Sequence, residues 1–161
     1  WIKKALPIYS VLTLSATGSE MDPFAVISDM SKNEKWGTSS EHMKPKMSIL
    51  DPEYTYSVSK KQTAAGTADM ISHICENYFT NVKNADVQAR FAEGLLKNCF
   101  KYGPIALEEP DNYDARANLM WTASMAINGI LSDGAEVSWC VHPMEHELSA
   151  TTTPLMSLPT S

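Results

Sequence analysis

Two pairs of potential metal ligands occur in this sequence at the same spacing. Asp69 and His73 are four residues apart, and His142 and His146 repeat that separation. Residues four apart lie on one face of a helix. Three of the chain's four histidines and one carboxylate can therefore converge on a divalent cation with mixed nitrogen and oxygen ligation. The spacing leaves an ordinary interpretation open, in which Pro143 begins a helix and the histidines cap or pack nearby.

The elements that must position these side chains change in kind near residue 58. Short β-branched and apolar runs predict three strands before it, at residues 6–14, 25–28 and 47–50, the first of them buried, with 29–37 as a charged, hairpin-like connection. Apolar residues at helical spacing predict four helices after it, at residues 60–78, 85–102, 113–131 and 138–150. Gly103-Pro104 is expected to end the second helix. Strands followed by helices predict two layers that meet at a cleft.

Composition excludes several classes of partner. The net charge is −6 and no run of Lys or Arg exceeds two residues, so nucleic acid is not an expected partner. No apolar stretch approaches the roughly 20 residues that cross a bilayer, and the N-terminus does not resemble a signal peptide. We therefore expect a cytoplasmic protein without a membrane partner. Cys75, Cys99 and Cys140 are widely spaced and odd in number, which favours reduced thiols.

A polar turn follows the first predicted strand. Thr13 and Thr17-Gly18-Ser19 offer hydroxyl groups and backbone amides, which suit phosphate or amide recognition. The same residues also form ordinary strand-ending turns. Lys35 lies in the charged connection, where most lysines are simply solvated.

Five segments follow one another in an order and at spacings that would rarely arise by chance: Leu12–Glu20, Leu50–Pro52, Ala65–His73, Tyr113–Trp121 and His142–Ser149. In these segments, from about residue 6 to 150, the chain resembles the iron-containing alcohol dehydrogenase family, and within it the NAD(P)H-dependent butanol dehydrogenase branch. The resemblance implies a dehydroquinate synthase-like fold, with a dinucleotide-binding α/β domain followed by an all-α metal-binding domain. Residues 1–58 would be the end of the first domain and 59–150 the first part of the second, so that the fold is truncated at both ends. Full-length members of the family are expected to be homodimers.

The resemblance also assigns roles to the ligand pairs. It implies that Asp69, His73 and His142 bind Fe(II), or sometimes Zn(II), and that His146 is a catalytic residue near the nicotinamide that relays a proton. The implied reaction is reversible hydride transfer between NAD(P)(H) and a primary alcohol or aldehyde, such as butanol or butanal. The metal would stabilise the alkoxide.

Four further residues match positions that contact the NAD(P)H cofactor in the family. Thr13 and Thr17 belong to the polar turn, Lys35 aligns with a lysine near the cofactor, and Leu50 aligns with an apolar contact. These assignments come from the motifs alone.

The chain departs from the family pattern after Ala150. The family places a further metal histidine there, whereas this sequence continues Thr-Thr-Thr-Pro-Leu-Met to residue 156. A shift of one base in Tyr-Tyr-Asp-Thr-Thr-His codons can produce that string, so we hypothesise that residues 151–161 are an aberrant, frameshifted tail. A divergent natural terminus is the alternative, and resequencing the source DNA distinguishes the two. Without the fourth ligand we expect weaker metal binding and impaired activity.

Two other functions fit the same residues. One is a non-catalytic helical metal-binding or structural fragment, and the other is a metallohydrolase that uses the same ligands without nicotinamide. The polar turn and the order of the motifs favour the dehydrogenase.

Overall fold

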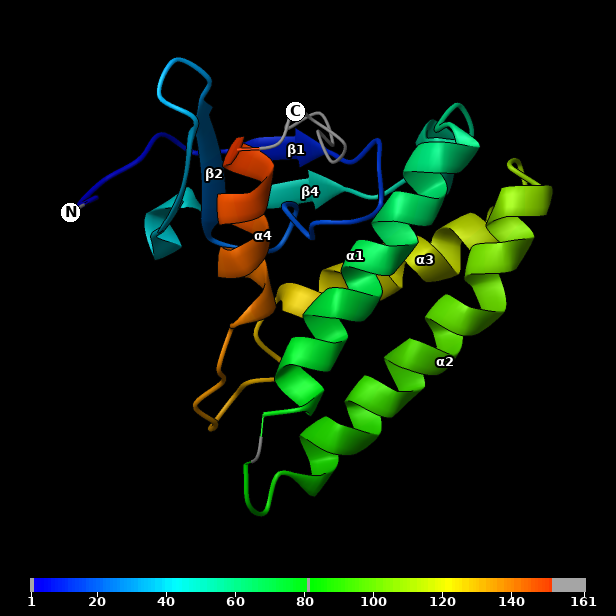
Figure 1. The fold of residues 1–161 in the computed structure, drawn as a ribbon. Helices are drawn as coiled ribbons and strands as arrows, with labels where there is room; N and C mark the ends of the chain where they lie inside the picture. The colour runs from blue at the N-terminus through cyan, green and yellow to red at the C-terminus, as the bar shows by residue number, and fades with distance from the viewer. Residues whose placement is uncertain (1, 81, 152–161) are drawn as a thin grey trace.

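The structure, a computed structural model, describes residues 2–80 and 82–151. Its helices are α1 (Lys60–Tyr78), α2 (Asp86–Glu108), α3 (Tyr113–Ile127) and α4 (Val141–Thr151) (Figure 1). Strands β1 (Tyr9–Val11) and β4 (Met47–Ile49) form a parallel pair, and β2 (Phe24–Asp29) and β3 (Glu34–Ser39) form an antiparallel hairpin. Two short 3₁₀ helices, η1 (Glu41–Met43) and η2 (Pro52–Thr55), flank β4.

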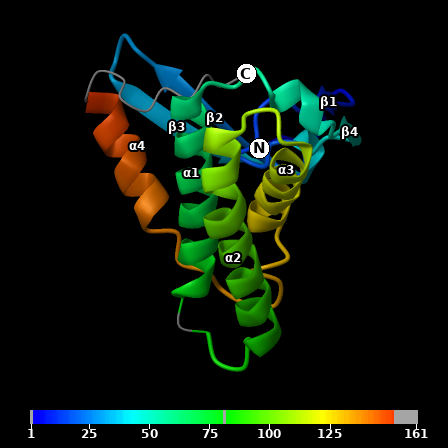
Figure 2. The same ribbon diagram turned by 90° about the vertical axis from the view of Figure 1, so that its right-hand side faces the viewer.

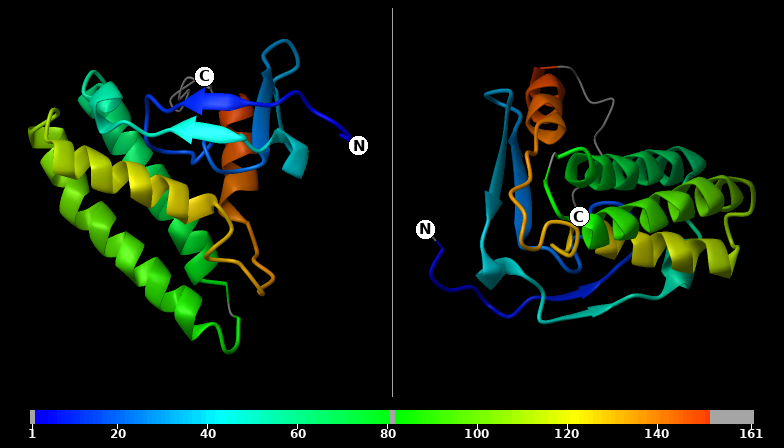
Figure 3. Two further views of the ribbon diagram at one scale, coloured as in Figure 1. Left: turned by 180° about the vertical axis from the view of Figure 1, so that it is seen from behind. Right: turned by 90° about the horizontal axis from the view of Figure 1, so that it is seen from below.

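Helices α1, α2 and α3 pack side by side, whereas α4 lies on the other side of α1, against the β2–β3 hairpin (Figure 2). The two strand pairs are separate pieces that meet the helices along different sides (Figure 3). The described residues thus form a layer of three helices, a few strands and a fourth helix that packs against the hairpin. Within the described ranges no helix is long and apolar enough to cross a membrane.

The core lies among the first three helices. Met70 and Ile74 of α1 are buried against Ala92 and Cys99 of α2. Small side chains on α2 allow the helix axes to approach closely, because protein interiors are densely packed. Helix α1 has the predicted bounds and begins after Ser59, whose side chain accepts a hydrogen bond from the backbone N–H of Gln62 at 3.2 Å.

The predicted end of α2 at Gly103-Pro104 is wrong, because the helix continues to Glu108. Proline removes one backbone hydrogen bond, but tertiary packing offsets that loss here. Gly103 is buried, and a Cβ atom placed on it would lie 2.9 Å from Cγ2 of Thr67 on α1. Ala106, one turn later, is also buried. Burial of this last turn therefore outweighs the local stop signal.

Other predicted bounds need correction too. The expected buried strand at residues 6–14 is reduced to β1, which pairs with β4 on one edge. Tyr9 and Val11 of β1 are 67% and 52% exposed, because no layer covers them among the described residues. The expected connection at 29–37 contains most of strand β3. Helix α3 ends at Ile127 rather than 131, before Gly129 with its positive φ of 105°, and α4 begins at Val141 rather than 138.

The polar turn is held between the helices and the strands. Gly18 has a φ of 70°, and a Cβ atom there would clash with Cγ2 of Ile127 on α3, so only glycine fits. The buried Glu20 carboxylate accepts a hydrogen bond from the Ser124 hydroxyl. The Glu20 carbonyl accepts one from Ser48 of β4 at 2.7 Å. This turn fixes the β1–β4 pair against α1 and α3.

Candidate metal centre

One face of α1 carries three side chains that can hold or support a cation. Asp69, His73 and Glu76 follow at steps of four and three residues, which keeps them on the same side of a helix. His73 is 3% exposed and Glu76 is 6% exposed, and Asp69 is half-buried. Polar groups buried to this degree require partners.

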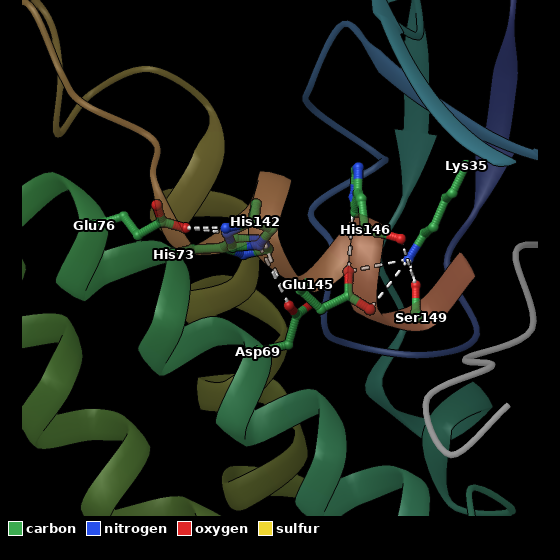
Figure 4. Close-up of polar contacts among 8 residues, drawn as sticks. All are labelled: Lys35, Asp69, His73, Glu76, His142, Glu145, His146 and Ser149. Atoms are coloured by element: carbon green, nitrogen blue, oxygen red, sulfur yellow. Dashed lines mark hydrogen bonds and ion pairs between the residues drawn. The ribbon is translucent and has the colours of Figure 1, made fainter. Parts of the chain in front are cut away.

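Helix α4 brings His142 to this face (Figure 4). Nε2 of His73 lies 3.6 Å from Oδ1 of Asp69, and Nε2 of His142 lies 3.7 Å from the same oxygen. The two imidazole rings are stacked, with centroids 4.7 Å apart. The ligand atoms of these three residues all lie within 4.8 Å of one another, so the structure brings together the three residues to which the resemblance assigns the metal.

The spacing suits a cation better than direct hydrogen bonds. Separations of 3.6 and 3.7 Å are too long for hydrogen bonds between these groups. Two ligand atoms each about 2.1 Å from a tetrahedral ion lie about 3.4 Å apart. Nδ1 of His73 is buried without a hydrogen-bond partner among the described residues. Two imidazoles and one carboxylate are a donor set that iron and zinc accept, so these residues fit the metal.

The protonation of the two histidines differs. Burial lowers the pKa of His73, although the Asp69 carboxylate opposes this effect. His73 is therefore neutral at neutral pH, as a ligand must be. The pKa of His142 is raised chiefly by Asp69, and also by Glu76, against the effect of burial. A proton on His142 and a metal ion would compete for the same nitrogen.

Two residues near the metal centre were not predicted from the sequence. The Glu76 carboxylate contacts Nδ1 of His142 on the side of the ring away from Asp69. The Trp139 ring meets the rings of His73 and His142 edge-on, with centroid distances of 6.0 and 5.3 Å. Glu76 could have been found by extending the helical spacing from Asp69 and His73 by one turn. Trp139 precedes α4 in an irregular segment and has no periodic signal.

A second polar cluster lies beside the first, on α4 and β3. Nζ of Lys35 lies 3.0 Å from Oε2 of Glu145 and 3.1 Å from Oγ of Ser149. Lys35 is therefore not the simply solvated lysine that its charged surroundings predict. His146 lies between this cluster and the three metal-binding candidates (Figure 4), and it is not one of the converging group. Burial, and then Lys35, lower the pKa of His146.

The other residues predicted to contact cofactor lie outside the metal group. Thr13 and Thr17 are exposed residues of the polar turn, and Leu50 is half-buried directly after β4. Their contact with a dinucleotide stays a prediction. The proposed aberrant tail, except for its first residue, Thr151, lies outside the described residues.

Two family models match this chain. One describes an iron-containing alcohol dehydrogenase and matches residues 1–52. The other describes the C-terminal part of the Fe-containing alcohol dehydrogenase family and matches residues 63–153.

Curated relatives agree with these matches. The chain is 61% identical over 149 residues to NADH-dependent butanol dehydrogenase A of Clostridium acetobutylicum, covering 92% of this chain and 38% of that protein. It is 46% identical over 149 residues to the NADPH-dependent aldehyde reductase YqhD of Escherichia coli, with the same coverage. This chain therefore spans 38% of the length of these relatives.

Solved structures show the same fold. The TM-score is 0.90, at 44% identity, with NADH-dependent butanol dehydrogenase A from Thermotoga maritima, and 0.91, at 45% identity, with E. coli YqhD. Each comparison covers 93% of this chain and 38% of the other chain.

Proposed function

Because this chain belongs to the iron-containing alcohol dehydrogenase family, we propose that it is part of a metal-dependent alcohol dehydrogenase or aldehyde reductase. The reaction would transfer hydride between NAD(P)(H) and a primary alcohol or aldehyde, such as butanol or butanal. The observation that carries this proposal is the convergence of Asp69, His73 and His142 within 4.8 Å. Relatives named as butanol dehydrogenases and an aldehyde reductase support the substrate class.

Each candidate residue has a definite part in this proposal. Asp69, His73 and His142 would hold Fe(II), or Zn(II). When bound, the metal supplies a positive charge that favours an alkoxide over an alcohol, and nicotinamide supplies the hydride donor or acceptor. His146, whose pKa is lowered, is neutral at neutral pH and would accept a proton at its imidazole. Trp139 would limit access of water to the two ligand imidazoles that it contacts.

The remaining expectations belong to the same proposal. Thr13, Thr17, Lys35 and Leu50 would contact the dinucleotide. Residues 1–58 would belong to a dinucleotide-binding domain and 59–150 to a metal-binding domain of the dehydroquinate synthase-like fold. Homodimer formation and a cytoplasmic location are expected by analogy with dehydrogenases of the family.

A metal-binding measurement tests the proposal directly. We expect one Co(II) or Zn(II) ion per chain at this centre, and binding at least about 100-fold weaker in Asp69→Ala and His142→Ala, since each removes a ligand. His42→Ala is the matched control, because His42 is the remaining histidine and is exposed on η1. Isothermal titration calorimetry with metal analysis gives stoichiometry and affinity.

Three results would count against the proposal. Equal binding by the wild type and Asp69→Ala would show that the converging residues are not the site. Stoichiometric binding without butanal-dependent oxidation of NADH or NADPH, in this chain and also in a chain extended to the length of its relatives, would favour the alternative of a non-catalytic metal-binding fragment. Hydrolysis without nicotinamide would instead indicate a metallohydrolase.

A further inference from the structure

We propose that Glu76 is a positioning residue for the ligand His142, and that one carboxylate couples the docking of α4 to the assembly of the metal centre. This inference rests on the proposed metal-binding function. Glu76 contacts the side of the His142 ring that faces away from Asp69.

Three groups of α4 converge on the Glu76 carboxylate. Its Oε2 accepts a hydrogen bond from the backbone N–H of Val141 at 2.8 Å. Its Oε1 accepts one from the backbone N–H of His142 at 3.2 Å and also contacts Nδ1 of the His142 ring. Glu76 belongs to α1 and is 65 to 66 positions away from these partners. The contacts are therefore tertiary and depend on how α4 docks.

The ring contact selects the nitrogen that can bind a metal. A histidine that donates Nδ1–H to a carboxylate keeps its Nε2 lone pair free, and ligand histidines are commonly oriented in this way. Here Nε2 is the atom that faces Oδ1 of Asp69, at 3.7 Å. Glu76 thus fixes both the tautomer and the direction of the ligand.

The two backbone contacts cap α4. Val141 and His142 are the first residues of this helix, and their N–H groups have no acceptor within it. Cys140 precedes them, and cysteine is a weak hydrogen-bond acceptor compared with the usual capping residues. The buried Glu76 carboxylate of α1 accepts these hydrogen bonds in place of a capping side chain, and its negative charge also complements the helix dipole. Losing Glu76 would therefore release the start of α4 and the ligand together.

Burial of Glu76 shows that the interaction is specific. Its side chain is 3% exposed, and a buried carboxylate is costly without hydrogen-bond donors. The donors from α4 satisfy it. Nothing else on α1 places a carboxylate at this point, because Asp69 lies nearly two turns earlier and faces the other ring nitrogen.

Substitutions of Glu76 test the proposal through metal affinity and spectroscopy. We expect Co(II) affinity to fall by about 10- to 100-fold in Glu76→Gln, and further in Glu76→Ala, which removes the cap as well. The visible Co(II) absorption envelope of saturated Glu76→Gln should match the wild type, because the ligand atoms are unchanged. Glu93→Gln is the control: this carboxylate on α2 accepts a hydrogen bond from the Tyr78 hydroxyl at 3.0 Å.

Two further measurements do not depend on bound metal. In wild type, the Nδ1–H proton of His142 should give a downfield, slowly exchanging NMR signal that moves upfield in Glu76→Gln and disappears in Glu76→Ala. Amides of α4 should exchange faster in Glu76→Ala than in Glu76→Gln. A purely structural cap would change the exchange rates in Glu76→Ala and leave Co(II) affinity unchanged in Glu76→Gln.

The outcomes separate the two proposals. Wild-type Co(II) affinity in Glu76→Gln would overturn the positioning role, and so would an altered Co(II) spectrum, which would make Glu76 a ligand. Absence of Co(II) binding by the wild type would contradict the proposed function instead. In that case an unchanged Nδ1–H signal in Glu76→Ala would also overturn the role of Glu76.

Discussion

Asp22 is a buried carboxyl group at the end of the polar turn, and it makes this region sensitive to pH. Burial raises the pKa of Asp22 to about 6, and the nearby Glu20 adds to this, although a hydrogen bond from the Phe24 backbone N–H opposes it. An acid with a raised folded-state pKa releases its proton first in the unfolded chain. Its contribution to the free energy of unfolding therefore falls as the pH rises from about 4 to about 6.

Replacing the Asp22 carboxyl group should remove this pH dependence of the free energy of unfolding. We expect Asp22→Asn to gain stability relative to the wild type as the pH rises through this interval, by about 1 to 3 kcal/mol, and to keep that gain above it. Asparagine can still accept the Phe24 hydrogen bond, so the turn is retained. Urea unfolding at a series of pH values measures the difference between the two proteins.

Asp29 provides the opposite case in the same measurement. Its pKa is lowered by hydrogen bonds from Ser31, so its contribution to stability is lost as the pH falls. The difference between Asp29→Asn and the wild type should run the other way. A pH-independent difference for Asp22→Asn would contradict our account of Asp22.

At the scale of single residues, the sequence predicts some members of the metal centre and misses others. Asp69 and His73 share a helix, so their spacing alone places them together. The spacing left their convergence with His142 as one of two interpretations, and the resemblance was needed to choose it, because 68 residues lie between His73 and His142. Glu76 follows the helical spacing of Asp69 and His73 and was missed because that spacing was not extended by one turn. Trp139 was missed because an edge-on ring contact has no periodic signature. The ligand roles themselves stay predictions.

At the scale of elements, Gly66 determines how closely α1 approaches the polar turn. A Cβ atom there would lie 2.7 Å from the carbonyl oxygen of Ser15 and 3.2 Å from Cβ of Ala16. Gly66→Ala should therefore destabilise the chain by about 1 to 3 kcal/mol, because backbone would have to move. Thermal unfolding with a urea series measures the change.

Gly94 on α2 is the matched control for this substitution. Nothing lies within 4 Å of a Cβ atom placed on Gly94. Gly94→Ala should stabilise the chain by about 0.5 to 1 kcal/mol, since alanine loses less conformational entropy in a helix. Destabilisation of the same size by both variants would point to a general effect and would contradict the close contact at Gly66.

The competition between local sequence signals and tertiary packing explains which elements the sequence could predict. Helix α1 was predicted at both ends because Ser59 caps it and the apolar spacing is regular. The end of α2 was wrong because burial of Gly103 and Ala106 outweighs a local proline. Strand β3 was missed because it begins with two charged residues, contains a glycine and is largely exposed. Backbone pairing with β2 therefore forms it without a buried apolar face.

At the scale of the whole molecule, α4 is attached both to α1 and to the hairpin. Glu76 of α1 holds its first residues. Lys35 of β3 pairs with Glu145 and Ser149 farther along the helix. The helix that carries His142 and His146 therefore bridges the hairpin and the helical layer. If Lys35 also contacts the dinucleotide, as the resemblance implies, cofactor binding would alter the second attachment.

Removing the lysine tests whether this attachment matters. The side chains of Lys35 and Glu145 are 18% and 25% exposed, so the pair is partly shielded and the loss leaves Glu145 without its cation. We expect Lys35→Met to speed hydrogen exchange of the α4 amides by about 3- to 10-fold. Lys32→Met is the control, because Lys32 is in the same hairpin and its pairing with Asp29, at 3.7 Å, is largely exposed.

The charge reversal completes this test. Lys35→Glu should loosen α4 more than Lys35→Met, since two carboxylates would then face each other. Adding Glu145→Lys should restore much of the protection, because the pair is re-formed in the opposite sense. Faster exchange in Lys32→Met would indicate a general effect of removing positive charge from the hairpin. No rescue by the double variant would mean that the pair of Lys35 and Glu145 does not hold α4. Rescue would instead make the hairpin a structural support of the metal centre, since it would steady the helix that presents His142.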